Sequence, residues 1–440
     1  MSSRSTRILC TGDLHLGRYP SRIPSHQREL SVGHVWLDIV DYAVQQDVDV
    51  VAMTGDIVDE ENKLYEAFGP LQSGVRQLEE ANIDVVAVAG NHDYNALPRL
   101  SGMVESERFT LLGQGGQWNS VTITPNQSTP VQIIGWSFRH RHINTSPIDS
   151  LPADLFDADI PTIGLLHADL DVKDSVYAPV TLNQLREQPV AAWLLGHIHA
   201  HQVWDKRSPL VLYPGSPQPL RPTETGAHGP WIVEVEKDGA ARVSHIPRST
   251  LRYSAFDVDL SDIDQADNLE GAVTDAIRDK LQEAKDTGPE IQHLVCRLRL
   301  HGRTGLHRVI QDRAIEWAHN LEVPQTGLVA TVDQVDVETR PELDLTRIAK
   351  GNDPPGVLAQ LLLALEEDDD AREVDDELLQ DAWGQIQSAV EQVTHSSAYQ
   401  PLRESGTIEP RQDDLLVAAR RQGLLLLDEL HAQTRPNSDA

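Results

Sequence analysis

The sequence predicts an α/β sandwich, a mixed sheet structure with helices on the outside. Residues 1–250 alternate short apolar runs with helix-like or loop segments. These runs are apolar throughout, which is typical of sheets that are covered on both faces. Five of them end abruptly at Asp, Asn or His, and ligands of such sheets gather where strands end.

The first part of the chain is expected to form two successive βαβ units. Apolar residues spaced i, i+3, i+4 predict an amphipathic helix over 25–45 and a second helix over 65–81. Strands are expected on either side of each helix, at 8–10, 50–53 and 85–89. The carboxyl ends of three strands would therefore face the same edge of a sheet.

Residues 117–138 predict a β-hairpin, with its turn at 125–130. Further strands lead into His167 and His199. Three more apolar runs are expected to form antiparallel strands, and these are residues 210–216, 231–239 and 241–247.

We expect three domains: residues 1–250, residues 251–350 as a small α+β capping domain, and residues 351–440 as an acidic helical region. The capping domain mixes three strand-like runs with two helix-like segments. The Pro pair in GNDPPG (351–356) predicts a linker or turn. The last strong helical pattern covers 412–431.

The 440-residue chain carries a net charge of −31. Residues 1–250 hold 19 basic and 30 acidic side chains, and residues 251–440 hold 18 and 38. Acidity in both parts favours a surface adapted to a salty cytoplasm over an acidic tail that binds a basic partner. We find no membrane-spanning run and no secretory signal, and the two cysteines lie in separate apolar runs. A cytoplasmic protein with no membrane contact is therefore expected.

The polar residues at the five strand ends predict a metal site. A single Asp-X-His or a lone His on an apolar strand is more often an ordinary structural residue, but five such endings in one chain indicate a shared function. Asp, Asn and His together form an oxygen- and nitrogen-rich set of ligands. The residues are Asp13 and His15; Asp56; Asn91, His92 and Asp93; His167; and His197 and His199.

In this order the motifs resemble those of the calcineurin-like metallophosphoesterase superfamily. The resemblance implies a four-layer αββα sandwich that holds two divalent ions, with Mn²⁺ as the expected metal and Fe²⁺ or Zn²⁺ as alternatives. Asp56 would bridge both ions, and His92 would face the scissile phosphate without binding metal. Asp93 would accept a hydrogen bond from His92 or from a ligand. One ion would also bind Asp13, His15 and His199, and the other Asn91, His167 and His197.

Two further stretches, YPGSPQP (213–219) and RLRLHGRTGLH (297–307), resemble the SbcD/YhaO-like branch of DNA repair exonucleases. The resemblance implies that the chain cleaves DNA and docks on an SbcC-type SMC-like ATPase. Residues 412–430 are a candidate docking helix, although packing on its own domain is an equal alternative. The oligomeric state is left open, with a homodimer among the options. Asp59 stands where this branch usually has His, which puts processive exonuclease action in doubt.

Several arginines near the motifs could contact a nucleic acid backbone. Phosphate contacts position a nucleic acid without reading its sequence, which suits a repair nuclease. The alternative is that each of them is an ordinary surface arginine held in a salt bridge. The candidates are Arg18, Arg139, Arg141 and Arg221.

Three functions therefore stay open. The first is a phosphodiesterase that acts on DNA with an ATPase partner. The second is a metallophosphoesterase that acts on a small nucleotide or a phosphoprotein, which Asp59 and the acidity favour. The third is a non-catalytic binding subunit, which the complete ligand set disfavours.

The acidic surface predicts that the fold is more stable at high salt than at low salt. Because dissolved ions screen repulsion between like charges, the melting temperature is expected to rise between about 0.1 M and 3 M KCl, roughly the screening range. Differential scanning calorimetry checks this. A melting temperature that is independent of salt would contradict the interpretation.

Overall fold

The computed structural model describes residues 4–23, 27–59, 64–205, 209–288, 290–365 and 412–434, with isolated short pieces between 380 and 392. The chain divides into two compact units, Met1–Arg340 and Pro341–Ala440. The boundary expected near residue 250 falls inside the first unit, so the division into three domains stays a prediction.

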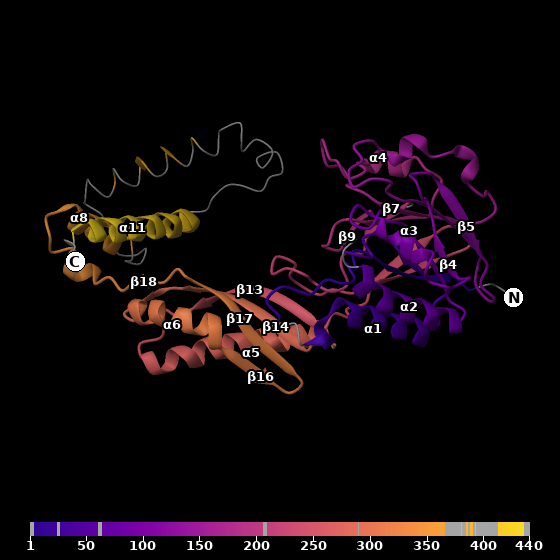
Figure 1. The fold of residues 1–440 in the computed structure, drawn as a ribbon. Coiled ribbons are helices and arrows are strands. Elements are labelled where there is room, and N and C mark those ends of the chain that lie inside the picture. Colours follow the sequence, from indigo (N-terminus) through magenta and orange to yellow (C-terminus); the bar gives the residue numbers. More distant parts are fainter. Residues whose placement is uncertain are drawn as a thin grey trace. The chain divides into compact units, whose positions relative to one another are not determined.

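Two six-stranded sheets form the core of the first unit (Figure 1). In spatial order, the first contains β12 (Ala241–His245), β11 (Trp231–Val235), β1 (Thr6–Thr11), β2 (Val50–Met53), β3 (Asp84–Ala87) and β4 (Phe109–Leu111). The second contains β5 (Asn119–Ile123), β6 (Val131–Trp136), β7 (Thr162–His167), β8 (Ala192–Gly196), β10 (Leu210–Tyr213) and β9 (Gln202–Asp205).

Successive side chains along each strand point to opposite faces of the sheet, so the two sheets and the helices outside them form four layers. Leu9 and Val51 face a core shared with α1 (Val32–Gln45), α2 (Leu64–Glu80) and α3 (Ala96–Ser101). Their neighbours Ile8 and Val50 face the second sheet. The far side of the second sheet, with Trp193, packs on α4 (Leu182–Arg186) and nearby loops. The expected αββα sandwich is confirmed.

Parallel pairing sets the strand ends at one edge. Strands β1, β2, β3 and β4 run parallel, with Thr11, Met53 and Ala87 in register. Strands β6, β7 and β8 also run parallel, and His167 is opposite Gly196. The loops that follow these strands therefore emerge together.

The predicted hairpin at 117–138 forms as β5 paired with β6. The expectation of three antiparallel strands after residue 209 holds only in part for the first, because β10 pairs antiparallel with β9 but parallel with β8. Strand β9 lies at the edge of the sheet, and β10 therefore lies between β9 and β8. Strands β11 and β12 are antiparallel, as expected, but they extend the other sheet.

The remainder of the first unit is the expected α+β fold. Its four-stranded sheet runs β13 (Leu251–Asp259), β14 (His293–His301), β17 (Leu328–Val337) and β16 (Glu322–Gln325). Helices α5 (Leu269–Thr287) and α6 (His307–Asn320) pack on it around a core that includes Ile277, Leu298 and Trp317.

The second unit contains α7 (Leu345–Ile348), α8 (Pro354–Ala364) and α11 (Gln412–Thr434). The prolines expected to form a linker instead begin α8. Asp353 caps this helix by accepting the amide of Gly356 at 3.1 Å, and Pro in a first turn forfeits no helical hydrogen bond.

The candidate docking helix packs within its own unit, because Leu427 of α11 is fully buried against Leu362 of α8. The acidic run 366–370 lies outside the described residues. Within the described ranges, no helix is long and apolar enough to cross a membrane.

His293 at the start of β14 generates a prediction about pH. It is 4% exposed, its Nε2 lies 2.9 Å from Thr331 Oγ1, and burial lowers its pKa to about 4. Because the unfolded chain takes up this proton near pH 6.5 and the folded chain does not, His293 stabilises the fold above about pH 6.5, and up to about 3 kcal/mol is lost as the pH falls towards 4.

A His293→Gln variant is therefore expected to lose less stability than the parent across this window. Urea unfolding midpoints measured at a series of pH values check this difference. Equal pH dependence in the two proteins would show that His293 does not contribute.

Candidate metal centre

The edge where the parallel strands end collects the polar residues that the sequence singled out. Most of them are buried, including Asp13, Asp56 and His167 at 0%, 2% and 0% exposure. Among the described residues, ligand atoms within each of three groups lie no more than 4.8 Å apart. Two of these groups are Asp13, His15 and His199, and Asp56, His167 and His197, and the third, which shares His15 with the first, is His15, Asp59 and His92.

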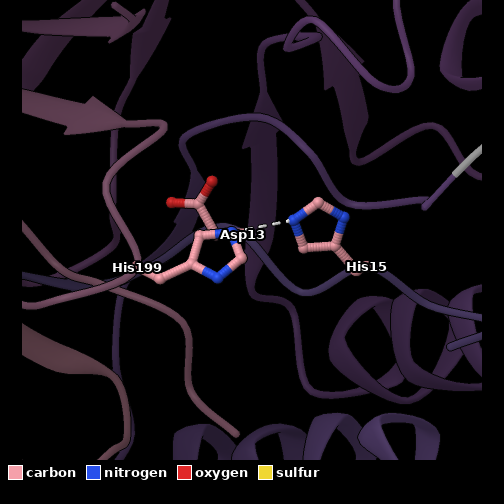
Figure 2. Close-up of side chains that lie close together, drawn as sticks. All are labelled: Asp13, His15 and His199. Atoms are coloured by element: carbon pink, nitrogen blue, oxygen red, sulfur yellow. Dashed lines mark hydrogen bonds between the residues drawn. The ribbon is translucent and has the colours of Figure 1, made fainter. Parts of the chain in front are cut away.

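In the first group, the Nε2 atoms of His15 and His199 lie 3.1 Å apart, and the Asp13 carboxylate lies beside the two rings (Figure 2). The backbone amide of His197 donates to both oxygens of Asp13, each at 3.1 Å. Asp13 is thereby held between the end of β1, which it follows, and the end of β8, which His197 follows.

The second group meets at Asn91, whose Oδ1 lies 3.0 Å from His167 Nε2 and 3.1 Å from His197 Nδ1. Asp56 Oδ2 is 3.4 Å from His167 Nε2 and 4.0 Å from His15 Nε2. Asp56 therefore lies between the groups, where a carboxylate shared by two ions would have to be.

This arrangement fits divalent metal ions. A neutral imidazole has one N–H, and two Nε2 atoms face each other at His15 and His199. Nitrogens that each lie about 2.1 Å from one ion would be separated by about this distance. In addition, Nδ1 of His15 is buried without an aligned hydrogen bond, although it lies 3.1 Å from Asp59 Oδ1.

The other nitrogen of three candidate ligands has its own polar neighbour. Nδ1 of His167 donates to the carbonyl oxygen of Thr54 at 3.0 Å. Nδ1 of His199 lies 2.9 Å from Glu224 Oε1, and Nε2 of His197 lies 3.3 Å from Asp169 Oδ1. Such partners orient a ligand ring and raise its basicity.

Glu224 and Asp169 were not predicted from the sequence. Asp169 is two residues beyond His167, a spacing that could have indicated it. Glu224 lies 25 positions from His199 in a loop, and no local pattern indicates it.

Four of these polar residues have left-handed backbone conformations. The φ angles are 48° at Asp13, 51° at His15, 49° at Asp56 and 103° at His197. Such conformations cost about 1–3 kcal/mol each and cluster at functional sites. Loop hydrogen bonds hold them: the amide of Asp13 donates to Gly55 and that of His15 to Asp56, both at 2.9 Å.

Charges in the centre shift several pKa values. Burial alone would raise the pKa of Asp56, but His167 and His15 hold it well below its usual range. Burial would lower the pKa of His167, yet Asp56 and Asp13 raise it to about 9. The pKa of His197 falls to about 3 because of burial and the neighbouring His167. Asp56 is therefore a persistent anion at the middle of the centre.

His92 stands next to the ligand groups, with its ring centroid 5.0 Å from that of His15. Its Nδ1 donates to the carbonyl oxygen of Asp59 at 3.0 Å, and its amide donates to Asp56 Oδ1 at 2.9 Å. Burial lowers its pKa. These two bonds fix the ring and leave Nε2 for another partner.

Asp93 is fully buried. The expected donor to this carboxylate was His92 or a ligand, but the carboxylate accepts hydrogen bonds from the amides of Gly90 and Ile57, each at 2.7 Å, and of Val58 at 3.3 Å. Burial and the nearby Asp56 raise its pKa to about 7. Asp93 therefore ties the loop after β2 to the loop after β3.

Asp59 contacts three candidate functional residues. Its side chain lies 3.1 Å from His15 Nδ1 and accepts from Arg18 Nη1 at 3.2 Å, and its carbonyl holds His92. Burial would raise the pKa of Asp59, but His15 and Arg18 keep it below the ordinary value.

The candidate arginines differ in their surroundings. Arg18 is half-buried and paired with Asp59, while Arg139, Arg141 and Arg221 are exposed. The run that contains Arg139 and Arg141 ends at His142, whose ring lies 5.7 Å from Tyr177, and the Tyr177 ring lies 4.7 Å from His197. This run therefore reaches the rim of the centre through two aromatic contacts.

Comparison with known proteins agrees with the geometry. Residues 6–201 match the calcineurin-like phosphoesterase family, and residues 253–340 match the middle domain of the metallophosphoesterase YhaO. The chain thus contains a calcineurin-like phosphoesterase domain followed by a domain of the YhaO middle-domain family. More narrowly, the combination of the two domains is consistent with the SbcD/YhaO-like branch.

Two relatives share moderate identity. The chain is 27% identical to the uncharacterized metallophosphoesterase YhaO of Bacillus subtilis over 45% of this chain and 48% of that protein. It is 25% identical to the DNA double-strand break repair protein Mre11 of Haloferax volcanii over 71% of this chain and 65% of that protein. The chain therefore spans less than two thirds of either relative.

Among solved structures, a dimetal phosphatase from Danio rerio is 14% identical, with a TM-score of 0.35, over 55% of this chain and 100% of that one. A calcineurin-like phosphoesterase, YfkN from Bacillus subtilis, is 14% identical, with a TM-score of 0.38, over 64% and 98%. Those scores are too low to support a structural argument.

Gly90 generates a prediction about metal binding. A Cβ at this position would collide with Asp56 Oδ1, so Gly90→Ala is expected to displace the carboxylate between the groups. Mn²⁺ at 100 times its Kd would stabilise the parent by about 2.7 kcal/mol, and the variant should lose most of this gain. Thermal unfolding with Mn²⁺ and with a chelator measures it.

Gly69→Ala is the matched control. Gly69 is exposed within α2, and an added Cβ meets nothing within 4 Å, so this variant should keep the full response to Mn²⁺. An unchanged response in Gly90→Ala would mean that Asp56 does not bind the ions.

Proposed function

We propose that this chain is a dinuclear-metal-dependent phosphodiesterase that hydrolyses DNA and works with an SbcC-type SMC-like ATPase. The observation that carries the proposal is the position of Asp56 between two candidate ligand groups, with the imidazole of His92 beside them. The relative named as a DNA double-strand break repair protein, which matches 71% of this chain, supports DNA as the substrate.

Two divalent ions bound by these groups would supply Lewis acidity and lower the pKa of a water molecule that attacks a phosphoester. We propose Mn²⁺ as the metal, with Fe²⁺ or Zn²⁺ as alternatives, because mixed imidazole and carboxylate ligands suit all three.

His92 has the features of a proton donor to the leaving oxygen. Its Nδ1–H is engaged by the carbonyl of Asp59, so its Nε2 is left for the substrate. When protonated, this nitrogen can donate to the departing oxygen or stabilise charge on the phosphoryl group. Burial lowers the pKa of His92, and the nearby Asp56 carboxylate offsets part of this effect.

The exposed arginines would hold the nucleic acid backbone. Arg139 and Arg141 lie in the run that reaches the rim of the centre through His142 and Tyr177. Phosphate contacts of this kind position DNA without selecting a sequence.

A second candidate function is hydrolysis of a small nucleotide or a phosphoprotein at the same centre. The pairing of Asp59 with Arg18 at 3.2 Å favours it, because this carboxylate occupies one cation that a DNA strand could use.

The experiment compares Mn²⁺-dependent cleavage of linear duplex and single-stranded DNA with cleavage of p-nitrophenyl phosphate and its bis ester. His92→Gln is expected to lose about 100-fold or more of the activity on DNA, because general acid–base catalysis contributes about that much. His319→Gln, an exposed residue on α6, is the control and should retain activity.

The same assay separates the two candidates. Asp59→His, which restores the usual residue of the branch, is expected to raise exonuclease action if the substrate is DNA. Cleavage of only the small esters, by the parent and by Asp59→His, would favour the second candidate. Equal activity of His92→Gln and the parent on all substrates would exclude the catalytic role of His92.

A further inference from the structure

The β10–β11 loop, residues 214–230, holds the candidate ligand His199 at two points. The amide of Ser216 donates to the carbonyl oxygen of His199 at 2.9 Å, and Glu224 Oε1 lies 2.9 Å from His199 Nδ1. Both the backbone and the ring of His199 are therefore positioned by this loop.

Glu224 is in turn fixed by the loop around it. Its Oε2 accepts the amide of Leu220 at 2.6 Å, its side chain is 12% exposed, and its own amide donates to the carbonyl oxygen of Arg221 at 2.9 Å. Leu220 also accepts the amide of Ser21 at 3.0 Å. The Glu224 carboxylate thus has a set orientation relative to residues 20–23.

The same loop contacts the start of the α+β part of the unit. Thr225, next to Glu224, forms a parallel bridge with Tyr253 of β13. The hydroxyl of Tyr253, a residue only 1% exposed, donates to the carbonyl oxygen of Ser21. At the other end of the loop, Gln218 accepts from Ser249 Oγ at 2.6 Å.

We propose that Tyr253 is a positioning residue, which acts through Ser21, Leu220 and Glu224 to set the orientation of His199 and hence the metal affinity of the His15–His199 group. Docking of β13 on the β10–β11 loop then controls how tightly one of the two ions is held. The second group has no such link among the described contacts, because His167 is held by Thr54 and His197 lies beside Asp169. The proposal rests on the proposed dinuclear centre but not on DNA as its substrate.

The test uses the full chain, titrated with Mn²⁺ alone by isothermal titration calorimetry. Tyr253→Phe removes the hydroxyl and keeps the buried ring, and Glu224→Gln keeps the shape of the side chain and removes its charge. Loss of such an outer partner typically costs about 10–100-fold in metal affinity. We expect a loss in this range for Glu224→Gln and a smaller, several-fold loss for Tyr253→Phe, at one of the two binding events.

Thr331→Val is the matched control. It removes the hydrogen bond between Thr331 and His293 inside the same α+β sheet, which does not touch the β10–β11 loop. It should leave both Mn²⁺ affinities unchanged if the contact through Tyr253, and not general loosening of this sheet, is what matters.

Three results would overturn the proposal: Mn²⁺ affinities of Tyr253→Phe equal to those of the parent, equal weakening of both binding events, or the same weakening in Thr331→Val. Failure of the proposed function looks different. In that case the parent would bind two Mn²⁺ ions and leave DNA intact, while the effect of Tyr253→Phe on one ion would persist.

Discussion

The centre depends on one geometric constraint, the meeting of parallel strand ends from two stacked sheets. Because β1, β2 and β3 end in register, and β7 and β8 end beside them, Asp13, Asp56 and His167 are brought together in the interior. Buried carboxylates are costly without compensating charge, and here the compensation comes from neighbouring imidazoles and from backbone amides. The layered core therefore forces together groups that would otherwise stay in water.

The position of Asp56 shows how much of this could be predicted. An apolar run that stops at Gly55 and Asp56 indicates a strand end, and repetition of that pattern indicates convergence, so the sequence alone pointed to the fold class and to the ligand set. The assignment of individual ligands to each ion came from the family resemblance, and the structure brings those residues together in two groups.

Other features depend on contacts between distant segments, which local patterns do not encode. The parallel pairing of β10 with β8 depends on the position of β9 at the edge. Glu224 lies beside His199 because the loop after β10 brings it there, whereas His199 itself follows β8. The Pro pair at 354 and 355 fits both a break and a helix start, and only the cap from Asp353 decides between them.

The contact between Asp59 and Arg18 has a consequence for how substrates enter. A phosphate group that bound Nη1 of Arg18 would replace a carboxylate that is already there. One anion then exchanges for another, so the net charge around the guanidinium hardly changes and dissolved salt should have little influence on that step. If DNA is the substrate, its attraction to the exposed Arg139 and Arg141 would weaken as salt rises, since released counterions drive it. At high salt, Arg18 would thus be the arginine whose binding to a phosphate depends least on the salt concentration.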